Sequence, residues 1–310
     1  MSNFTAMQSA SHLAKVNPQT GPDSDIVRDY DNLFRIFYNY PPSLDAVNIA
    51  EAYIQCKTLL TLADMYDALE VVGPRTDHHL LQFQGRLWKQ IAKYPPSYLK
   101  LGYLARSKVI FAEALVHVVG QWPSGSNQLR HSVPDAVLEV IEDKVDDLQE
   151  RMTLTEARLF KLALVTSRGE RVTPSNSYMD WLALSLFRQW LAENTTPPPP
   201  PASKTTESSR NLPRLPQPVG PGKLYRLLGA GGSTYLNHDD LKRFLKLRPE
   251  DYTRDSMKKF EKRMDEIKQI ARETVRPLMK NCLELDMGRD GGGLGYLTCT
   301  NVDEDDFPWD

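Results

Sequence analysis

Glu113 and His117 are the pair of side chains whose types and spacing could do acid–base chemistry. They lie four residues apart, so on a helix they share one face, one turn apart. A carboxylate and an imidazole placed in this way can exchange protons with a substrate, provided that an open pocket lies beside them. A lone histidine on an apolar helix more commonly makes a structural hydrogen bond, and we favour that interpretation. A small-molecule enzyme using Glu113 and His117 is therefore the third functional hypothesis, and we predict no catalytic residue.

A metal site has one short candidate, the consecutive residues Asp77, His78 and His79. Consecutive helical residues point to different faces, so the three side chains cannot converge on one ion without ligands from elsewhere. The three cysteines of the chain are far apart or in unrelated contexts, and no pair of them has metal-ligand spacing. Cys56 lies on an amphipathic helix without a nearby histidine, which indicates a packed thiol rather than a nucleophile. We predict no metal site.

Two glycine-rich runs resemble phosphate-binding loops only superficially. Residues 229–234 lack the lysine and the preceding strand of a P-loop. Residues 291–295 lack the flanking strand and helix of a dinucleotide site. Both runs are predicted to be turns or breaks, and no cofactor is predicted.

Composition indicates an ordinary globular protein, with 41% hydrophobic and 25% charged residues and a net charge of −2. This charge gives no global field to attract nucleic acid or an anionic membrane. The basic residues of the last long helix alternate with acidic ones, which is typical of a solvated face, so direct nucleic-acid binding is not expected. No apolar run is long enough to cross a bilayer. Sparse, unpaired cysteines indicate a reducing compartment, either nucleus or cytoplasm.

The stretch 107–119 must occupy the centre of the fold, because it is apolar almost all the way round. Its polar interruptions are Lys108, Glu113 and His117. Ser107 is the predicted N-cap, and Gly120 the predicted residue after the C-cap. The other helices should pack around this one.

Helical periodicity dominates the rest of the chain and predicts an all-α multi-helix bundle. Proline and glycine pairs at 41–42, 73–74 and 95–96 are expected to separate helices, and Pro277 to kink the last one. Further helices are expected over residues 33–40, 46–69, 77–93, 135–164, 178–192 and 252–285. The predicted organisation is a disordered leader (1–25), a helical body (26–193), a proline-rich linker (194–222), a C-terminal helical arm (223–286) and a glycine-rich, acidic tail (287–310).

Two segments are candidate binding surfaces for another protein. In the tail, Phe307 and Trp309 offer aromatic anchors, and Asp305 and Asp306 keep the segment solvated; docking onto a partner and docking onto the chain's own body are equally favoured.

In the arm, Phe260, Met264 and Ile267 follow a heptad-like spacing. This seam would pack back on the body or join a partner helix, giving a homo- or hetero-oligomer.

Five segments carry a resemblance to a known family. Residues 33–40, 59–69 and 107–122, with 296–300 and 303–310 of the tail, resemble filamentous-fungal BTB (POZ) domain proteins. The resemblance implies the closing helices of a BTB domain followed by its helical extension, and it transfers no catalytic residue. One departure is that only about twenty-five polar residues precede the matching region, so BTB-type dimerisation cannot be carried over.

These observations favour a non-enzymatic protein-interaction adaptor or scaffold, which we expect in a nuclear, chromatin-associated complex. The BTB resemblance implies a second hypothesis, a substrate adaptor of a cullin-type ubiquitin ligase. The missing front of the BTB domain argues against the second hypothesis.

Overall fold

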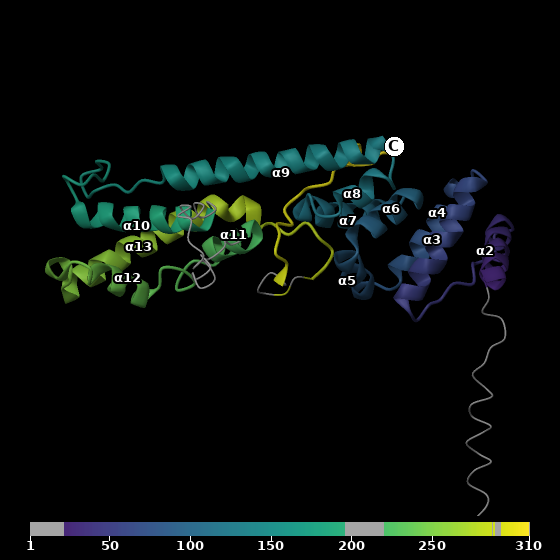
Figure 1. Cartoon of the computed structure of the whole chain (residues 1–310), viewed down its shortest axis with the longest axis horizontal. Helices are drawn as coiled ribbons and strands as arrows, with labels where there is room; N and C mark the ends of the chain where they lie inside the picture. Colours follow the sequence, from purple (N-terminus) through teal and green to yellow (C-terminus); the bar gives the residue numbers. More distant parts are fainter. Residues whose placement is uncertain (1–21, 196–219, 287, 289–292, 310) are drawn as a thin grey trace, which may run out of the picture. The chain divides into compact units, whose positions relative to one another are not determined.

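The computed structural model describes residues 22–195, 220–286, 288 and 293–309 (Figure 1). Within these residues the chain is helical, and its only β-type pairing is one isolated antiparallel bridge between Val165 and Arg171. The predicted all-α multi-helix fold is confirmed. The predicted leader at 1–21 and most of the predicted linker lie outside the described residues.

The chain forms two compact units, and their bounds differ from the predicted domains. Unit 1 comprises Met1–Leu115, His131–Val133 and Glu304–Asp310, and unit 2 comprises Val116–Arg130 and Pro134–Asp303. The predicted body of residues 26–193 is therefore not one unit. The physical reason is that the last long helix packs on helices from the second half of that body, a contact between distant segments that periodicity does not reveal.

Unit 1 consists of short helices joined by tight turns. Its helices are α2 (Pro22–Phe37), α3 (Ile49–Met65), α4 (Leu69–Leu81), α5 (Gly85–Lys93), α6 (Pro95–Leu104) and the first part of α7 (Lys108–Gln121). α3 packs against α2, α4, α5 and α6. Residues 22–25, expected in the leader, are helical, and an additional helix, α6, precedes the central helix.

Helix boundaries in unit 1 differ from those expected at Gly73-Pro74. Both residues lie inside α4, where a Cβ on Gly73 would come 2.6 Å from the carbonyl oxygen of Ala105. The chain turns instead at Asp67 and Gln84, which have φ angles of +51° and +47°. Neither residue is glycine, so the turns carry no strong sequence signal.

Helix α7 is buried as predicted, but the prediction that the other helices pack around it is wrong. The described helices of unit 1 pack around α3 and those of unit 2 around α13, because burial of an apolar helix does not require it to be the centre of the helix packing. Ser107 caps α7, since the Ile110 amide donates to Ser107 Oγ at 3.1 Å. The apolar side chains of the helix are almost all inaccessible, including Ile110, Phe111, Ala114, Leu115, Val116, Val118 and Val119. The exceptions are Val109, which is exposed, and Ala112, which is half-buried.

Unit 2 is built around α13 (Arg254–Val275), which packs against α9 (Asp135–Lys161), α10 (Tyr178–Thr195), α11 (Pro221–Ala230) and α12 (His238–Leu245) (Figure 1). A short helix, α8 (Ser126–Arg130), packs on α9. The last long helix is shorter than expected, because it ends at Val275 and Pro277 lies in a following 3-10 turn, Arg276–Met279. Proline in that turn avoids the lost hydrogen bond of a helix interior.

An extended segment, residues 294–300, runs through unit 2 and was expected to be part of the tail. Leu297, Cys299 and Thr300 are buried, although the segment has no helix or strand to pair its backbone. Two arginine side chains and one loop amide donate hydrogen bonds to four of its carbonyl oxygens. Arg226 donates to the carbonyl oxygens of Leu294 and Tyr296, the Cys282 amide donates to Thr298 at 2.9 Å, and Arg151 donates to Cys299 at 3.3 Å.

Gly120 makes room for this segment and does not terminate α7. The helix continues to Gln121, and a Cβ on Gly120 would lie 2.4 Å from the Leu297 carbonyl oxygen and 2.6 Å from the Tyr296 ring. The predicted C-terminal role of Gly120 is wrong because the glycine is required by close packing from a distant segment rather than by local backbone geometry.

We predict opposite outcomes for the same substitution at two helical glycines. Gly120→Ala should lower the free energy of unfolding by about 1–3 kcal/mol, because the added methyl group meets backbone that cannot move freely. Gly85→Ala has open space at its Cβ and should be neutral or stabilising by up to about 1 kcal/mol. Urea denaturation of both variants measures the difference, and equal stabilities would contradict the packing described here.

Candidate protein-interaction surfaces

The predicted tail anchors are docked on unit 1 of their own chain. Phe307 is 8% exposed, and its ring centroid lies 6.1 Å from that of Phe111 on α7. Trp309 packs edge-on against Phe111 at 5.0 Å and against Tyr103 of α6 at 6.1 Å. The two anchors also contact each other at 5.4 Å. We call the surface formed by Tyr103, Lys108 and Phe111 the tail dock.

Lys108 supplies the charge of the tail dock. Its Nζ lies 2.5 Å from a Glu304 carboxylate oxygen and 5.1 Å from the centre of the Phe307 ring. Asp305 is exposed and Asp306 half-buried in the same segment. Of the two interpretations of the tail, the structure shows docking on the chain's own body; binding of a partner by these residues stays a prediction.

The seam of α13 is covered by the chain's own helices. Phe260, Met264 and Ile267 are all buried, and Phe260 stacks on Phe244 of α12 with ring centroids 6.0 Å apart. The arm therefore packs back on helices of the predicted body, which is one of the two expected arrangements. Use of this seam by a partner helix stays a prediction, and it would require unit 2 to open.

The predicted acid–base pair is sealed from solvent. Glu113 is 2% exposed and His117 is fully buried. The Nδ1 atom of His117 lies 2.7 Å from the Tyr296 hydroxyl, so the imidazole makes the kind of structural hydrogen bond that we favoured. The enzyme hypothesis requires an open pocket beside both side chains. Neither Glu113 nor His117 lines the pocket in unit 2 that is described in the next paragraph.

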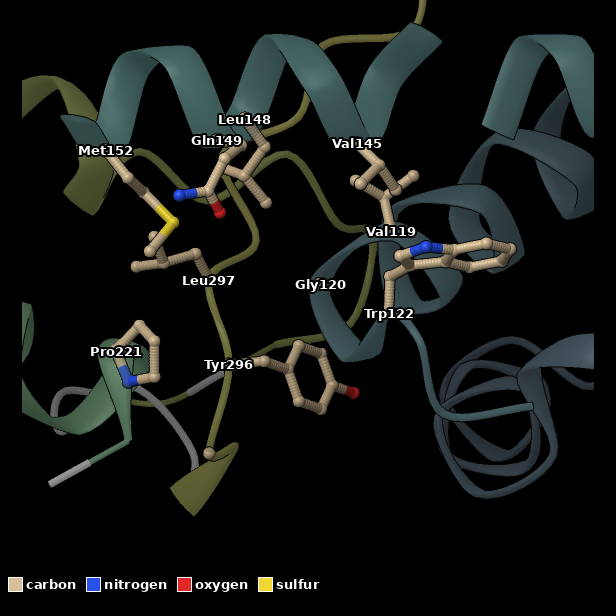
Figure 2. A pocket seen from close by; sticks show the side chains of 11 residues that line it. Val119, Gly120, Trp122, Val145, Leu148, Gln149, Met152, Pro221, Tyr296 and Leu297 are labelled. Carbon is tan, nitrogen blue, oxygen red and sulfur yellow. The ribbon is translucent and has the colours of Figure 1, made fainter. Parts of the chain in front are cut away.

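Unit 2 contains a pocket of about 190 Å³ (Figure 2). Apolar side chains from α7, α9 and the extended segment surround it, and Figure 2 shows Met152 and Leu297 on one side and Trp122 on the other. Gln149 contributes one amide, and none of the lining residues is charged. Tyr296 also lines the pocket, and its hydroxyl is hydrogen-bonded to His117.

The remaining candidate ligand groups have structural partners. Asp77 accepts a hydrogen bond from Ser107, and His79 Nε2 lies 2.8 Å from the Asp45 carbonyl oxygen. Within the described residues, no group of three or more His, Cys, Asp or Glu side chains could hold a metal ion. The glycine-rich run at 231–234 follows the C-terminus of α11, and the carbonyl oxygen of Gly232 accepts from Lys268 at 2.6 Å. The C-terminal end of a helix carries partial negative charge, which attracts a cation such as the Lys268 ammonium group and repels a phosphate.

Helix α2 presents an apolar surface that the sequence argument missed. Leu33 and Ile36 point into unit 1, whereas Val27, Phe34 and Phe37 are 67%, 53% and 46% exposed. With the half-buried Tyr30 they form a row at spacings of three, four and three residues, which we call the α2 row. One sequence signal could have revealed this surface. The apolar residues of α2 occupy more than one face, whereas a helix that packs on one side needs only one apolar face.

The surroundings of the α2 row are polar and ordered. Tyr30 contacts Tyr66 at the end of α3, with hydroxyl oxygens 3.0 Å apart. Beside the row on α2, Arg35 forms an ion pair with Asp31 at 2.8 Å. An apolar row with a polar rim is the usual anatomy of a protein-binding patch.

Comparison with known proteins adds no relative to this description. No family model, no curated protein and no solved structure matches the chain. The resemblance to BTB proteins therefore stays a prediction. None of the described helices combines the length and the apolar character needed to cross a membrane.

We predict that one thiol reacts quickly in the native protein. Burial raises the pKa of Cys56 to about 12 and also raises the pKa of Cys299, so both thiols stay protonated and covered at pH 8. Cys282 is only half-buried. Labelling with a chromogenic disulfide should show one fast equivalent that Cys282→Ser removes. Fast labelling that survives Cys282→Ser would contradict the burial of the other two thiols.

Proposed function

We propose that this protein is a non-enzymatic interaction module, an adaptor or scaffold, that works as a pair of copies joined through helix α2. The observation that carries the proposal is the α2 row. Covering these exposed apolar side chains would stabilise the protein by about 25 cal/mol per Å² of apolar surface removed from water. A patch of this kind on a folded unit is typical of a surface that another protein covers.

The spacing of the α2 row favours a helix as its occupant. Val27, Tyr30, Phe34 and Phe37 recur at alternating intervals of three and four residues. That pattern produces a seam nearly parallel to the helix axis, which a second helix can follow along its length. A strand or an extended peptide would meet only part of such a row.

The charges beside the row favour a second copy of this chain. Asp31 and Arg35 beside the row carry both signs, so they match the same pair on a second copy. In an antiparallel two-fold pair, one register places Asp31 of each copy opposite Arg35 of the other. Such an interface uses the same patch twice, as the commonest homodimers do. Tyr30 and the two phenylalanines supply the aromatic residues that dominate interface energetics.

The proposal predicts a dimer that depends on α2. Sedimentation equilibrium of the full chain should show a dimer at micromolar concentration, and Phe34→Glu with Phe37→Glu should give a monomer, because four carboxylates would be buried in the paired seam. Both positions are exposed, so this double variant should keep the helical content of the unchanged protein, and its melting temperature should match that of the unchanged protein at dilutions where the dimer has dissociated.

A matched control comes from unit 2. Leu154 on α9 is 50% exposed, close to the exposure of Phe34, and Leu154→Glu should leave the dimer intact. A monomer for the unchanged protein at the highest concentration examined would refute the proposal. So would a dimer that the Phe34 and Phe37 substitutions leave unaffected.

A further inference from the structure

We propose that the tail dock is a recognition site for acidic, aromatic peptide segments, that the chain's own residues 304–309 occupy it, and that a segment of the same chemistry from a partner protein displaces them. This inference rests on the contacts of unit 1 alone and is independent of pairing through α2. It names what a scaffold of this kind would capture.

The floor of the tail dock lies on two closely packed helices, and the tail aromatics Phe307 and Trp309 contribute to the burial of Phe111. Phe111 is fully buried on α7, and Tyr103 lies on α6. The two helices approach closely, because a Cβ on Gly102 would lie 2.8 Å from the Phe111 amide nitrogen. A binding surface held by packed helices keeps its shape when the ligand leaves, which lowers the free-energy cost of binding a replacement.

The bound tail defines the chemistry of the ligand. Glu304 pairs with Lys108, Phe307 lies under the same ammonium group and against Phe111, and Trp309 reaches Phe111 and Tyr103. The ligand therefore carries a carboxylate three residues before a first aromatic side chain and a second aromatic side chain two residues after it. Lys108 reads both the charge and the first ring, since an ammonium group attracts carboxylates and aromatic faces alike.

The tail is suited to being a displaceable ligand. Its regular structure is limited to a 3-10 turn at Glu304–Asp306, and Phe307 is its one buried side chain among the described residues 304–309. Asp305 is exposed, and Trp309 is only partly covered. A tethered ligand acts at an effective concentration in the millimolar range for short flexible connections, so a free peptide must compete with it. Binding in trans should be weak until the tail is detached.

The test uses the full chain with its tail anchors removed. A fluorescein-labelled peptide with the sequence of residues 303–310 is titrated with the Phe307→Ala, Trp309→Ala double variant and followed by fluorescence anisotropy. This double variant should bind the peptide at least tenfold more tightly than the unchanged protein does. The control is Asp305→Ala, which removes an exposed carboxylate but keeps both anchors, and it should bind as weakly as the unchanged protein.

A charge reversal tests whether Lys108 reads the ligand. Adding Lys108→Glu to the double variant should lower its affinity for the peptide at least tenfold. A peptide carrying Glu304→Lys should recover most of the lost affinity. Lys108 is exposed to solvent along part of its side chain, so its reversal should not disturb the core. A purely structural role of Lys108 would not produce this rescue.

Three results would overturn the proposal. The first is a double variant that keeps the unchanged protein's circular dichroism and melting temperature yet binds no peptide. The second is an unchanged protein that binds the peptide as tightly as the double variant, since its own tail would then not compete. The third concerns the unchanged chain: amide hydrogens of residues 304–309 that exchange only at the rate of global unfolding would show a tail that never leaves the dock.

Discussion

An extended backbone segment inside a helical unit is the constraint on which the rest of the structure depends. Residues 294–300 bury peptide groups that no ladder or helix satisfies, so other groups must be brought to them. Arg226 from α11 and Arg151 from α9 donate to three of the carbonyl oxygens. The position of these helices is therefore tied to a segment more than a hundred residues away from α9 in the chain.

Steric fit imposes the second half of this constraint. Gly120 on α7 and Gly222 on α11 both face Tyr296, and a Cβ at either position would come within 2.7 Å of Tyr296 or Leu297. The Tyr296 hydroxyl then meets His117, which explains how a fully buried imidazole is accommodated on an apolar helix. The path of one segment thus accounts for the close backbone approach at both glycines and for the hydrogen bond of His117 Nδ1.

The two candidate interaction surfaces differ in what already covers them. The tail dock pairs every principal group of its ligand with residues of α6 and α7, whereas the α2 row meets solvent although its side chains are as large. Aromatic composition alone therefore does not identify a free surface. The distinguishing quantity is the fraction of each side chain that the rest of the fold leaves exposed.

Local patterns in the sequence determined the helical class, the Ser107 cap and the burial of α7, because these depend on residues within a few turns of one another. Tertiary structure alone decided the role of Gly120, the docking of Phe307 and Trp309, and the division into two units, since each depends on contacts between distant segments. The α2 row falls between these cases. The sequence shows that α2 is rich in apolar residues. The tertiary structure decides which of them remain exposed to solvent, because Leu33 and Ile36 occupy the face that packs on unit 1.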